Sequence, residues 1–316
     1  MDAKILISVE QLYRYYGHHL AVESINFELA QGEVLGFLGP NGAGKSTTMQ
    51  MISGNLAPSA GRIRINGIDL LDTPKLAKAE IGYLPEQPPV YRDLTVDEYL
   101  YYCAKLHRVS RARRDQAVTR AKARCGLTEV SKRLIGNLSK GFQQRAGIAQ
   151  AILHSPAVVI LDEPTVGLDP NQIRDIRALI RELGESHGII LSTHILPEVQ
   201  ATCSRVQIIH QGRLVFSESM HDLERRLTSH VLLLETRERL DDSELEKLAG
   251  IDNVERLADT RARLHFQDSN PAGAVAACVA RHGWGLIELS LDRQTLEQVF
   301  VDLTCSDTSQ THRETA

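Results

Sequence analysis

Residues 39–47, which read GPNGAGKST, restrict the fold of this chain more than any other segment. An apolar run at 34–38 predicts a buried strand before them, and residues 47–52 can continue as a helix after them. In this strand–loop–helix setting the glycines turn backbone N–H groups toward phosphate, and the helix N-terminus adds a positive dipole. Lys45 can then reach the β- and γ-phosphates, and the Ser46 hydroxyl can ligate Mg²⁺. The segment is a P-loop pattern, and it predicts a nucleoside triphosphate site in an α/β fold.

The composition of the 316 residues is that of a globular protein, with 42% hydrophobic residues, 24% charged residues and a net charge of −4. This small negative net charge gives no strong electrostatic attraction to nucleic acid, so no nucleic-acid partner is expected. The five cysteines are scattered without a C-x-x-C pair, which favours reduced thiols over a disulfide framework or a zinc site. The N-terminus lacks a signal-peptide pattern, and no apolar run approaches the roughly 20 residues that cross a bilayer. We therefore expect any work at a membrane to depend on a partner.

The first two thirds of the chain have the pattern of a largely parallel sheet covered on both faces. Short alternating runs predict paired strands over 5–30 and a further strand over 61–69, with a turn at Asn66-Gly67. Residues 95–136 are helical in pattern and carry a basic cluster, either a solvated helix face or a surface for a permease loop or anionic lipid. Strand, helix and strand then follow at 157–161, about 170–183 and 188–192.

The pattern changes after about residue 220. Strands and helices are predicted in the order β-α-β-β-α-β, which suggests a small α+β ferredoxin-like domain. The six elements cover 230–235, 241–249, 253–258, 261–266, 271–281 and 286–291. A last helix is predicted at 295–303, and the polar residues 305–316 are expected to be a disordered tail.

A second motif, ILDEP at 160–164, supplies carboxylates beside the P-loop. Four apolar strand residues end in Asp162 and Glu163 at the carboxyl end of a strand, where ligands collect in open parallel sheets. Asp162 is the expected Mg²⁺ partner, directly or through water, and Glu163 is placed to polarise the water that attacks the γ-phosphate. The alternative is an ordinary Asp-Glu turn after a buried strand.

At residues 138–145 the chain reads LSKGFQQR, and with the P-loop and ILDEP it resembles the nucleotide-binding subunit of ATP-binding-cassette (ABC) transporters. The family signature is L-S-G-G-Q followed by Q-R. Lys140 stands in place of its first glycine, and Phe142 in place of its glutamine. Ser139 and the Gly141 N–H at a helix start can still bind a γ-phosphate. The resemblance implies a P-loop ATPase with a parallel-sheet core, an antiparallel β subdomain and a helical subdomain at about 95–155.

Other family elements follow in the expected order. The resemblance assigns Tyr16 to stacking on adenine, Asp169 to contact across a dimer, and His194 to contact with the γ-phosphate. The glutamine loop of the family reads Y-x-P-Q, whereas this chain has Tyr83-Leu84-Pro85-Glu86-Gln87. Strict register puts Glu86 in the place of the glutamine, but Gln87 is favoured here as the catalytic and metal-binding residue.

The resemblance gives a complete expected site for ATP and Mg²⁺. Catalysis is assigned to Glu163, His194 and Gln87, and the metal to Ser46, Asp162 and Gln87. The residues expected to bind nucleotide are Tyr16, Gly39, Pro40, Asn41, Gly42, Ala43, Gly44, Lys45, Ser46, Thr47, Ser139, Gly141 and Asp169. In the family two such domains pair head to tail, so that the signature of one closes over the ATP of the other. One copy of each motif implies a homodimer or a pair with a homologous ATPase.

The expected domains are an ATPase over 4–220 and an accessory domain over 221–304 that resembles those of bacterial exporter ATPases. The implied function is to hydrolyse ATP and power a permease from the cytoplasmic face of the membrane, with export favoured over import. The accessory domain is either a stability or dimerisation module or a ligand sensor. Two alternatives remain: a non-transport ABC ATPase acting on a cytosolic assembly, and a regulatory subunit without catalysis, which the acidic residues and His194 disfavour.

Overall fold

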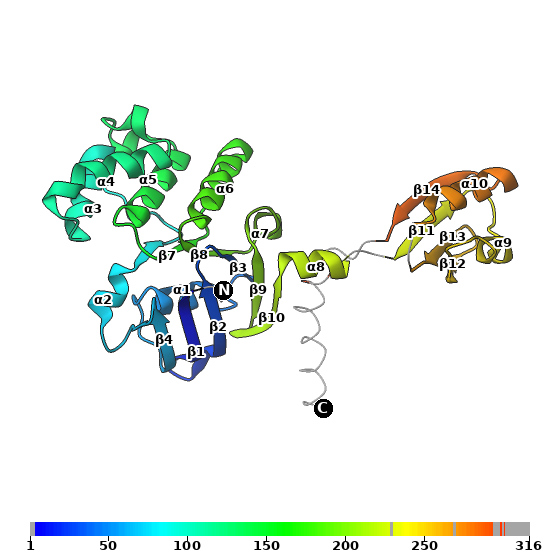
Figure 1. Ribbon diagram of the computed structural model, residues 1–316, viewed down its shortest axis with the longest axis horizontal. Helices are drawn as coiled ribbons and strands as arrows, with labels where there is room; N and C mark the ends of the chain where they lie inside the picture. Colours follow the sequence, from blue (N-terminus) through cyan, green and yellow to red (C-terminus); the bar gives the residue numbers. More distant parts are fainter. Residues whose placement is uncertain (1–3, 228–229, 268–269, 293–297, 299, 301–316) are drawn as a thin grey trace. The chain divides into compact units, whose positions relative to one another are not determined.

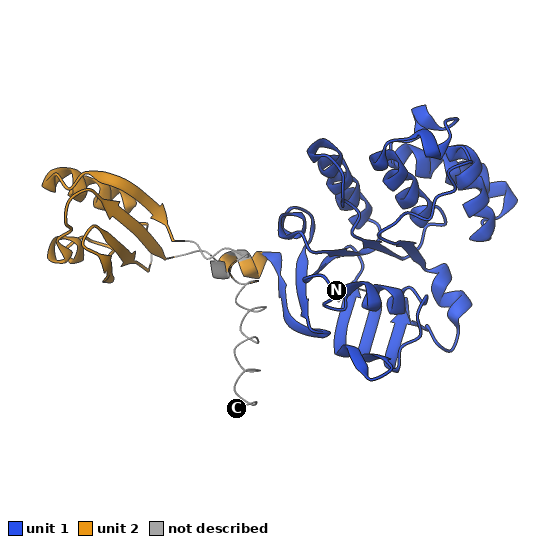
Figure 2. Ribbon diagram, turned by 180° about the vertical axis from the view of Figure 1, so that it is seen from behind, with its two compact units in different colours: residues 1–220 blue, residues 221–316 orange. Residues whose placement is uncertain are grey.

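The computed structural model describes residues 4–227, 230–267, 270–292, 298 and 300. It consists of two compact units, residues 1–220 and 221–316 (Figure 2), which are described separately below. The predicted tail at 305–316 lies outside the described residues, as does most of the helix predicted at 295–303.

The first sheet of the larger unit is antiparallel and begins with a long hairpin. Strands β1 (Ile5–Tyr16) and β2 (His19–Ala30) pair across the two-residue turn Gly17-His18. Strands β4 (Ala60–Ile65) and β5 (Ile68–Asp69) extend it in the order β2-β1-β4-β5. The predicted paired strands and the turn at Asn66-Gly67 are confirmed.

The second sheet is the core of the larger unit (Figure 1) and has the strand order β10-β9-β3-β8-β7-β6. Every residue of β3, β7 and β8 is buried, because the antiparallel sheet packs against these strands in one core cluster and helices contact them as well. All neighbouring strands are parallel except β10, which runs antiparallel to β9. The predicted parallel sheet is therefore confirmed. The bounds are β3 Val34–Leu38, β6 Ile81–Leu84, β7 Val158–Asp162, β8 Gly188–Thr193, β9 Arg205–His210 and β10 Arg213–Ser219.

The helices of this unit lie between its strands along the chain. The region 95–136 divides into two helices and two 3₁₀ turns, with a break at Arg108, whose φ of 57° no α-helix accommodates. Helix α3 begins at a capping box in which Thr95 Oγ1 accepts from Glu98 N, and Glu98 Oε2 accepts from Thr95 N. The bounds are α1 Lys45–Ile52, α2 Pro74–Ala79, α3 Val96–Leu106, α4 Arg111–Arg124, α5 Lys140–Ile152, α6 Pro170–Gly184 and α7 Leu196–Thr202.

Strand β6 and helix α5 approach each other closely at a glycine. A Cβ on Gly82 would lie 2.2 Å from the backbone oxygen of Ala151, which is far inside van der Waals contact. On the same helix, a Cβ on Gly147 would lie 2.5 Å from Leu84 and 3.1 Å from Pro88. These two glycines therefore fix the loop that leaves β6 against helix α5.

We expect Gly82→Ala to destabilise the larger unit, because the new methyl group meets backbone rather than a movable side chain. Overpacking of this kind costs about 2 kcal/mol of the free energy of unfolding. Thermal denaturation should show the midpoint of the larger unit lowered by roughly 4–8 °C. Gly273→Ala is the control, since no heavy atom lies within 4 Å of its added Cβ. An unchanged midpoint for Gly82→Ala would contradict the close approach.

The smaller unit begins within α8 (Met220–Leu227) and builds a four-stranded antiparallel sheet in the order β12-β13-β11-β14. Helices α9 and α10 pack with it around a core that includes Leu234, Leu264, Val275 and Trp284. The predicted β-α-β-β-α-β order is confirmed, but α9 is shorter than expected because the chain leaves the helix after Glu246 in tight turns. The bounds are β11 Val231–Thr236, α9 Asp242–Glu246, β12 Asn253–Ala258, β13 Arg261–His265, α10 Ala272–His282 and β14 Leu286–Leu291.

Within the part of the chain that the structure describes, no helix is both long enough and apolar enough to cross a membrane.

Candidate nucleotide site

The P-loop connects β3 to α1 in a conformation that depends on its glycines. Gly42 and Gly44 have φ values of 80° and 106°, in the region that side chains disfavour. A Cβ on Gly39 would lie 2.4 Å from the backbone oxygen of Ile209, so a larger residue does not fit there. Gly44 is the N-cap of α1, and the loop therefore presents the N-terminus of that helix to the site.

Lys45 is the buried cation of the site, with 5% of its surface exposed. Its Nζ donates to the carbonyl oxygens of Gly39 at 2.8 Å and Pro40 at 3.2 Å, and lies 3.8 Å from Oε1 of Glu163. Burial lowers the pKa of Lys45, while the nearby carboxylates of Glu163, Asp162 and Glu86 act in the opposite direction. The ammonium group is thus held among oxygen atoms that phosphate oxygens can replace.

Asp162 ends strand β7 and is 3% exposed. Its Oδ1 is buried and has no hydrogen-bond partner among the described residues. Burial raises the pKa of Asp162, and the hydroxyls of Ser192 and Ser46 lower it. An orphaned carboxylate oxygen beside a serine hydroxyl suits Mg²⁺, which takes only one or two protein ligands and completes its shell with water and phosphate.

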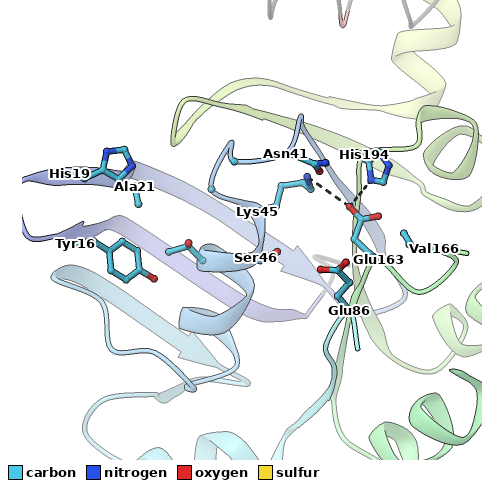
Figure 3. A pocket seen from close by; sticks show the side chains of 13 residues that line it. Tyr16, His19, Ala21, Asn41, Lys45, Ser46, Glu86, Glu163, Val166 and His194 are labelled. Carbon is cyan, nitrogen blue, oxygen red and sulfur yellow. Dashed lines mark hydrogen bonds and ion pairs between the residues drawn. The ribbon is translucent and has the colours of Figure 1, made fainter. Parts of the chain in front are cut away.

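Glu163 follows β7 and has a φ of 49°, in the left-handed region that a residue with a side chain rarely adopts. Its N–H donates to the Ser192 oxygen at 2.8 Å, which ties this backbone to strand β8. Nδ1 of His194 lies 2.9 Å from its Oε1, and the Thr193 hydroxyl donates to its Oε2 at 3.3 Å. Figure 3 shows Lys45 and His194 both directed at this one carboxylate.

Lys45, Glu163 and His194 line one cavity of about 450 Å³, whose lining residues do not include Asp162. Tyr16 and His19 enter it from the two ends of the β1–β2 turn, where they are register partners. Figure 3 shows Glu86 on the same side of the cavity as Glu163. The lining residues are Tyr16, His19, Ala21, Asn41, Gly42, Gly44, Lys45, Ser46, Thr47, Glu86, Glu163, Val166 and His194.

Glu86, and not Gln87, lines this cavity. Gln87 lines a neighbouring cavity, which Glu86 lines as well. The strict register of the Y-x-P-Q pattern, which points to Glu86, is the reading that the geometry supports.

Eight predicted residues lie outside the lining of this cavity: Gly39, Pro40, Ala43, Gln87, Ser139, Gly141, Asp162 and Asp169. Those of the signature and of the start of α6 each have a structural role in the single chain. Ser139 is the N-cap of α5. Gly141 is buried, and a Cβ there would lie 2.7 Å from the Gln172 side chain. Asp169 caps α6 by accepting from the N–H groups of Asn171 and Gln172 at 3.0 Å. The backbone oxygens of Gly39 and Pro40 accept from Lys45 Nζ, and that of Ala43 accepts from the Gly212 N–H.

Sequence reasoning missed four contributors to the site: the lining residues His19, Ala21 and Val166, and the buried Glu198. His19 could have been found from its position opposite Tyr16 across a two-residue turn. Glu198, which is 1% exposed, accepts hydrogen bonds from the hydroxyls of Thr165 and Thr193. Glu198 thereby ties α7 to Thr165, which follows Glu163 in the chain, and to Thr193 of β8, which donates to Glu163. No local sequence pattern marks Glu198.

A P-loop, a buried aspartate with a free oxygen and a glutamate at the mouth define a nucleotide-binding P-loop domain. A family model described as "ABC transporter" matches residues 22–166. An uncharacterized ABC transporter ATP-binding protein of Bacillus subtilis, YxlF, is 31% identical over 94% of this chain and 98% of its own length. The bacitracin transport ATP-binding protein BcrA of Bacillus licheniformis is 32% identical over 94% of this chain and 97% of its own.

The linearmycin resistance ATP-binding protein LnrL of Bacillus subtilis is 30% identical over 95% of this chain and 98% of its own. A solved structure of an ATP-binding subunit of an ABC transporter shares 33% identity and a TM-score of 0.63, over 70% of this chain and 92% of that one. This chain therefore belongs to the family of ABC transporter ATP-binding proteins.

Proposed function

We propose that this protein hydrolyses Mg–ATP and that the cycle of binding and hydrolysis powers an export complex in the membrane. The observation that carries the proposal is Glu163. Its carboxylate lies at the mouth of the P-loop cavity, within 2.9 Å of His194 and 3.8 Å of Lys45. A fixed carboxylate beside a phosphate site suits activation of a water molecule for phosphoryl transfer.

The roles of the other groups follow from their positions. Lys45 and the N–H groups at the start of α1 would hold the β- and γ-phosphates, and Ser46 and Asp162 would hold Mg²⁺. When bound, Mg²⁺ neutralises the charge that develops on the phosphate oxygens. His194 would move from Glu163 toward the γ-phosphate, which leaves the carboxylate free to accept a proton from water. Tyr16, 45% exposed at the cavity edge, offers a ring on which adenine can stack.

The proposed active form is a dimer, because three motif residues do not reach the cavity of their own chain. Ser139 and Gly141 lie at the N-terminus of α5, and Asp169 at the N-terminus of α6. Two helix N-termini on one surface suit an anion supplied by a second copy. Each ATP would then lie between the P-loop of one subunit and the signature of the other.

The names of two relatives support a role in export, which we place at the cytoplasmic face of the membrane. BcrA is named for bacitracin transport and LnrL for linearmycin resistance, and both align over nearly the whole of this chain, including the smaller unit. A membrane-embedded permease would convert closure of the dimer into movement of the cargo. Such coupling requires ATP to bind the closed dimer more tightly than the open one.

The purified protein tests this proposal directly. We expect ATP hydrolysis that requires Mg²⁺, rises more than linearly with protein concentration, and increases further when the permease is present in liposomes. Phosphate release measures all three dependences, and light scattering measures dimer formation. Binding of ATP without hydrolysis at any protein concentration would favour a regulatory subunit, and hydrolysis that the permease never changes would favour a non-transport ATPase.

A further inference from the structure

A cavity of about 750 Å³, called the arginine cavity below, is lined by the end of α3, by α4 and by the C-terminal end of α5. Three arginines supply its charge. Arg108 follows α3, and Arg113 and Arg120 lie on one face of α4, two helical turns apart. The lining residues that the structure describes include no carboxylate. The volume suits a small molecule, and the charge favours an anion.

The three arginines of the cavity differ from the next basic residues of the same helix. Further along α4, Arg124 pairs with Glu182 at 2.9 Å, and Lys122 pairs with Asp97. Within the described ranges, none of the three arginines takes part in an ion pair. The basic cluster of this region is therefore divided, and only the part that lines the cavity lacks acidic partners.

Helix α4 begins at this cavity with an unusual distribution of charge. Its N-cap, Ser110, lines the cavity, and among the described residues the Ser110 side chain caps no backbone N–H. The first turn contains no acidic residue, although it includes Arg111 and Arg113. Helix α3, in contrast, has Asp97 and Glu98 in its first turn. Because the N-terminus of a helix favours negative charge, an anion in the cavity would supply what α4 lacks.

Two stacked histidines form an uncharged wall of the cavity. The rings of His107 and His154 are 3.9 Å apart and nearly parallel, and Nε2 of His154 donates to the Ile81 oxygen at 3.0 Å. Burial lowers the pKa of His107, and it lowers that of His154 to about 4. Both rings are therefore neutral at pH 7, and the arginines alone set the charge of the cavity.

The arginine cavity is separate from the nucleotide cavity. The two have no lining residue in common among the residues that the structure describes. Ile81, the hydrogen-bond partner of His154, begins strand β6, whereas Glu86 of the nucleotide cavity follows the other end of that strand. A ligand of the arginine cavity is thus not the nucleotide that the P-loop would hold.

We propose that the arginine cavity binds a small phosphate-bearing ligand, whose phosphate lies against Arg108, Arg113 and the start of α4. The planar guanidinium group matches phosphate oxygens with paired hydrogen bonds, and the N–H groups of a helix start favour the same charge. Arg120 lies about 10 Å further along α4 and extends the attraction through the cavity. A free phosphomonoester and the headgroup of an anionic lipid both offer this chemistry.

Titration of the full-length protein tests the proposal with two probes. One is glycerol 3-phosphate, followed by calorimetry, and the other is phosphatidylcholine vesicles with and without phosphatidic acid, followed by flotation. We expect saturable binding of a phosphate probe, and Arg113→Gln should weaken it at least about tenfold, which corresponds to about 1.4 kcal/mol. Arg111→Gln is the matched control, because it removes the same charge from the same helical turn outside the cavity lining. It should change the affinity less than about twofold.

Lys45→Ala separates this cavity from the P-loop, which also attracts phosphate. Binding in the arginine cavity is retained in Lys45→Ala and lost in Arg113→Gln, whereas the reverse pattern would place the probe in the P-loop and contradict the proposal. Binding of glycerol 3-phosphate supports a free phosphomonoester, and binding of phosphatidic acid vesicles alone supports a lipid headgroup.

Two further results would overturn the proposal. One is no binding of either probe, and the other is an equal loss of affinity in Arg113→Gln and Arg111→Gln. Both arginines are exposed, so the thermal midpoints of these two variants should match that of the wild type. A change in affinity then reports on the cavity and not on folding.

Discussion

Glu163→Gln is expected to reduce ATP hydrolysis by at least about a hundredfold, the lower range for loss of a general base. The amide keeps the size of the side chain and can still face His194, but it cannot accept a proton from water. Nucleotide binding should remain, because loss of a negative charge beside the phosphates favours the anion. The variant should therefore accumulate as an ATP-bound dimer, which size-exclusion chromatography in Mg–ATP detects.

The control for this prediction is Glu185→Gln, at an exposed glutamate next to the C-terminus of α6. It should hydrolyse ATP at the wild-type rate and show no stable dimer. A Glu163→Gln protein with a normal rate would remove Glu163 from the chemistry. Loss of hydrolysis without any dimer would instead separate the catalytic role from the proposed closure.

Lys45→Ala is expected to weaken Mg–ATP binding by about a hundredfold, since charge-assisted hydrogen bonds contribute roughly 1.5–3 kcal/mol each. The buried ammonium group now donates to two carbonyl oxygens and faces Glu163. Its removal takes one donor from each of those oxygens, although the Pro40 oxygen still accepts from the Ala43 N–H, so the thermal midpoint should fall. Titration with a fluorescent ATP analogue measures the affinity, and hydrolysis should be lost in parallel.

For Lys45, the comparison variant is Lys132→Ala, which removes a lysine charge from an exposed position of the same unit. Its affinity for nucleotide should equal that of the wild type. Wild-type affinity in a folded Lys45→Ala protein would show that the P-loop backbone alone holds the phosphates. That result would leave Lys45 with a structural role only.

The nucleotide site could largely be predicted from the sequence, because its parts are local. The P-loop and the carboxylates after β7 are short segments whose conformation follows from glycines, apolar strands and helix starts. Tyr16 and His194 reach the same cavity because strands β1, β3, β7 and β8 bring their ends together. A pattern that depends on neighbouring residues is readable without tertiary structure.

The strict register of the Y-x-P-Q pattern points to Glu86, but the pattern alone does not show which of the two neighbouring side chains lines the nucleotide cavity, because segments far apart in sequence form that cavity. The buried role of Glu198 escaped for the same reason, since its partners Thr165 and Thr193 come from other segments. The break at Arg108 and the early end of α9 likewise reflect local backbone geometry that periodicity does not encode.

The left-handed backbone of Glu163 has a consequence for how this protein can change. A side chain in that region costs about 1–3 kcal/mol, which the surrounding strands must offset. Asparagine or glycine at the position would relieve the cost and give a more stable but inactive chain. Substitutions at residue 163 that raise stability therefore remove activity, and only selection for ATP turnover retains the glutamate. Thermostabilised variants obtained without an activity screen should be sequenced first at residue 163.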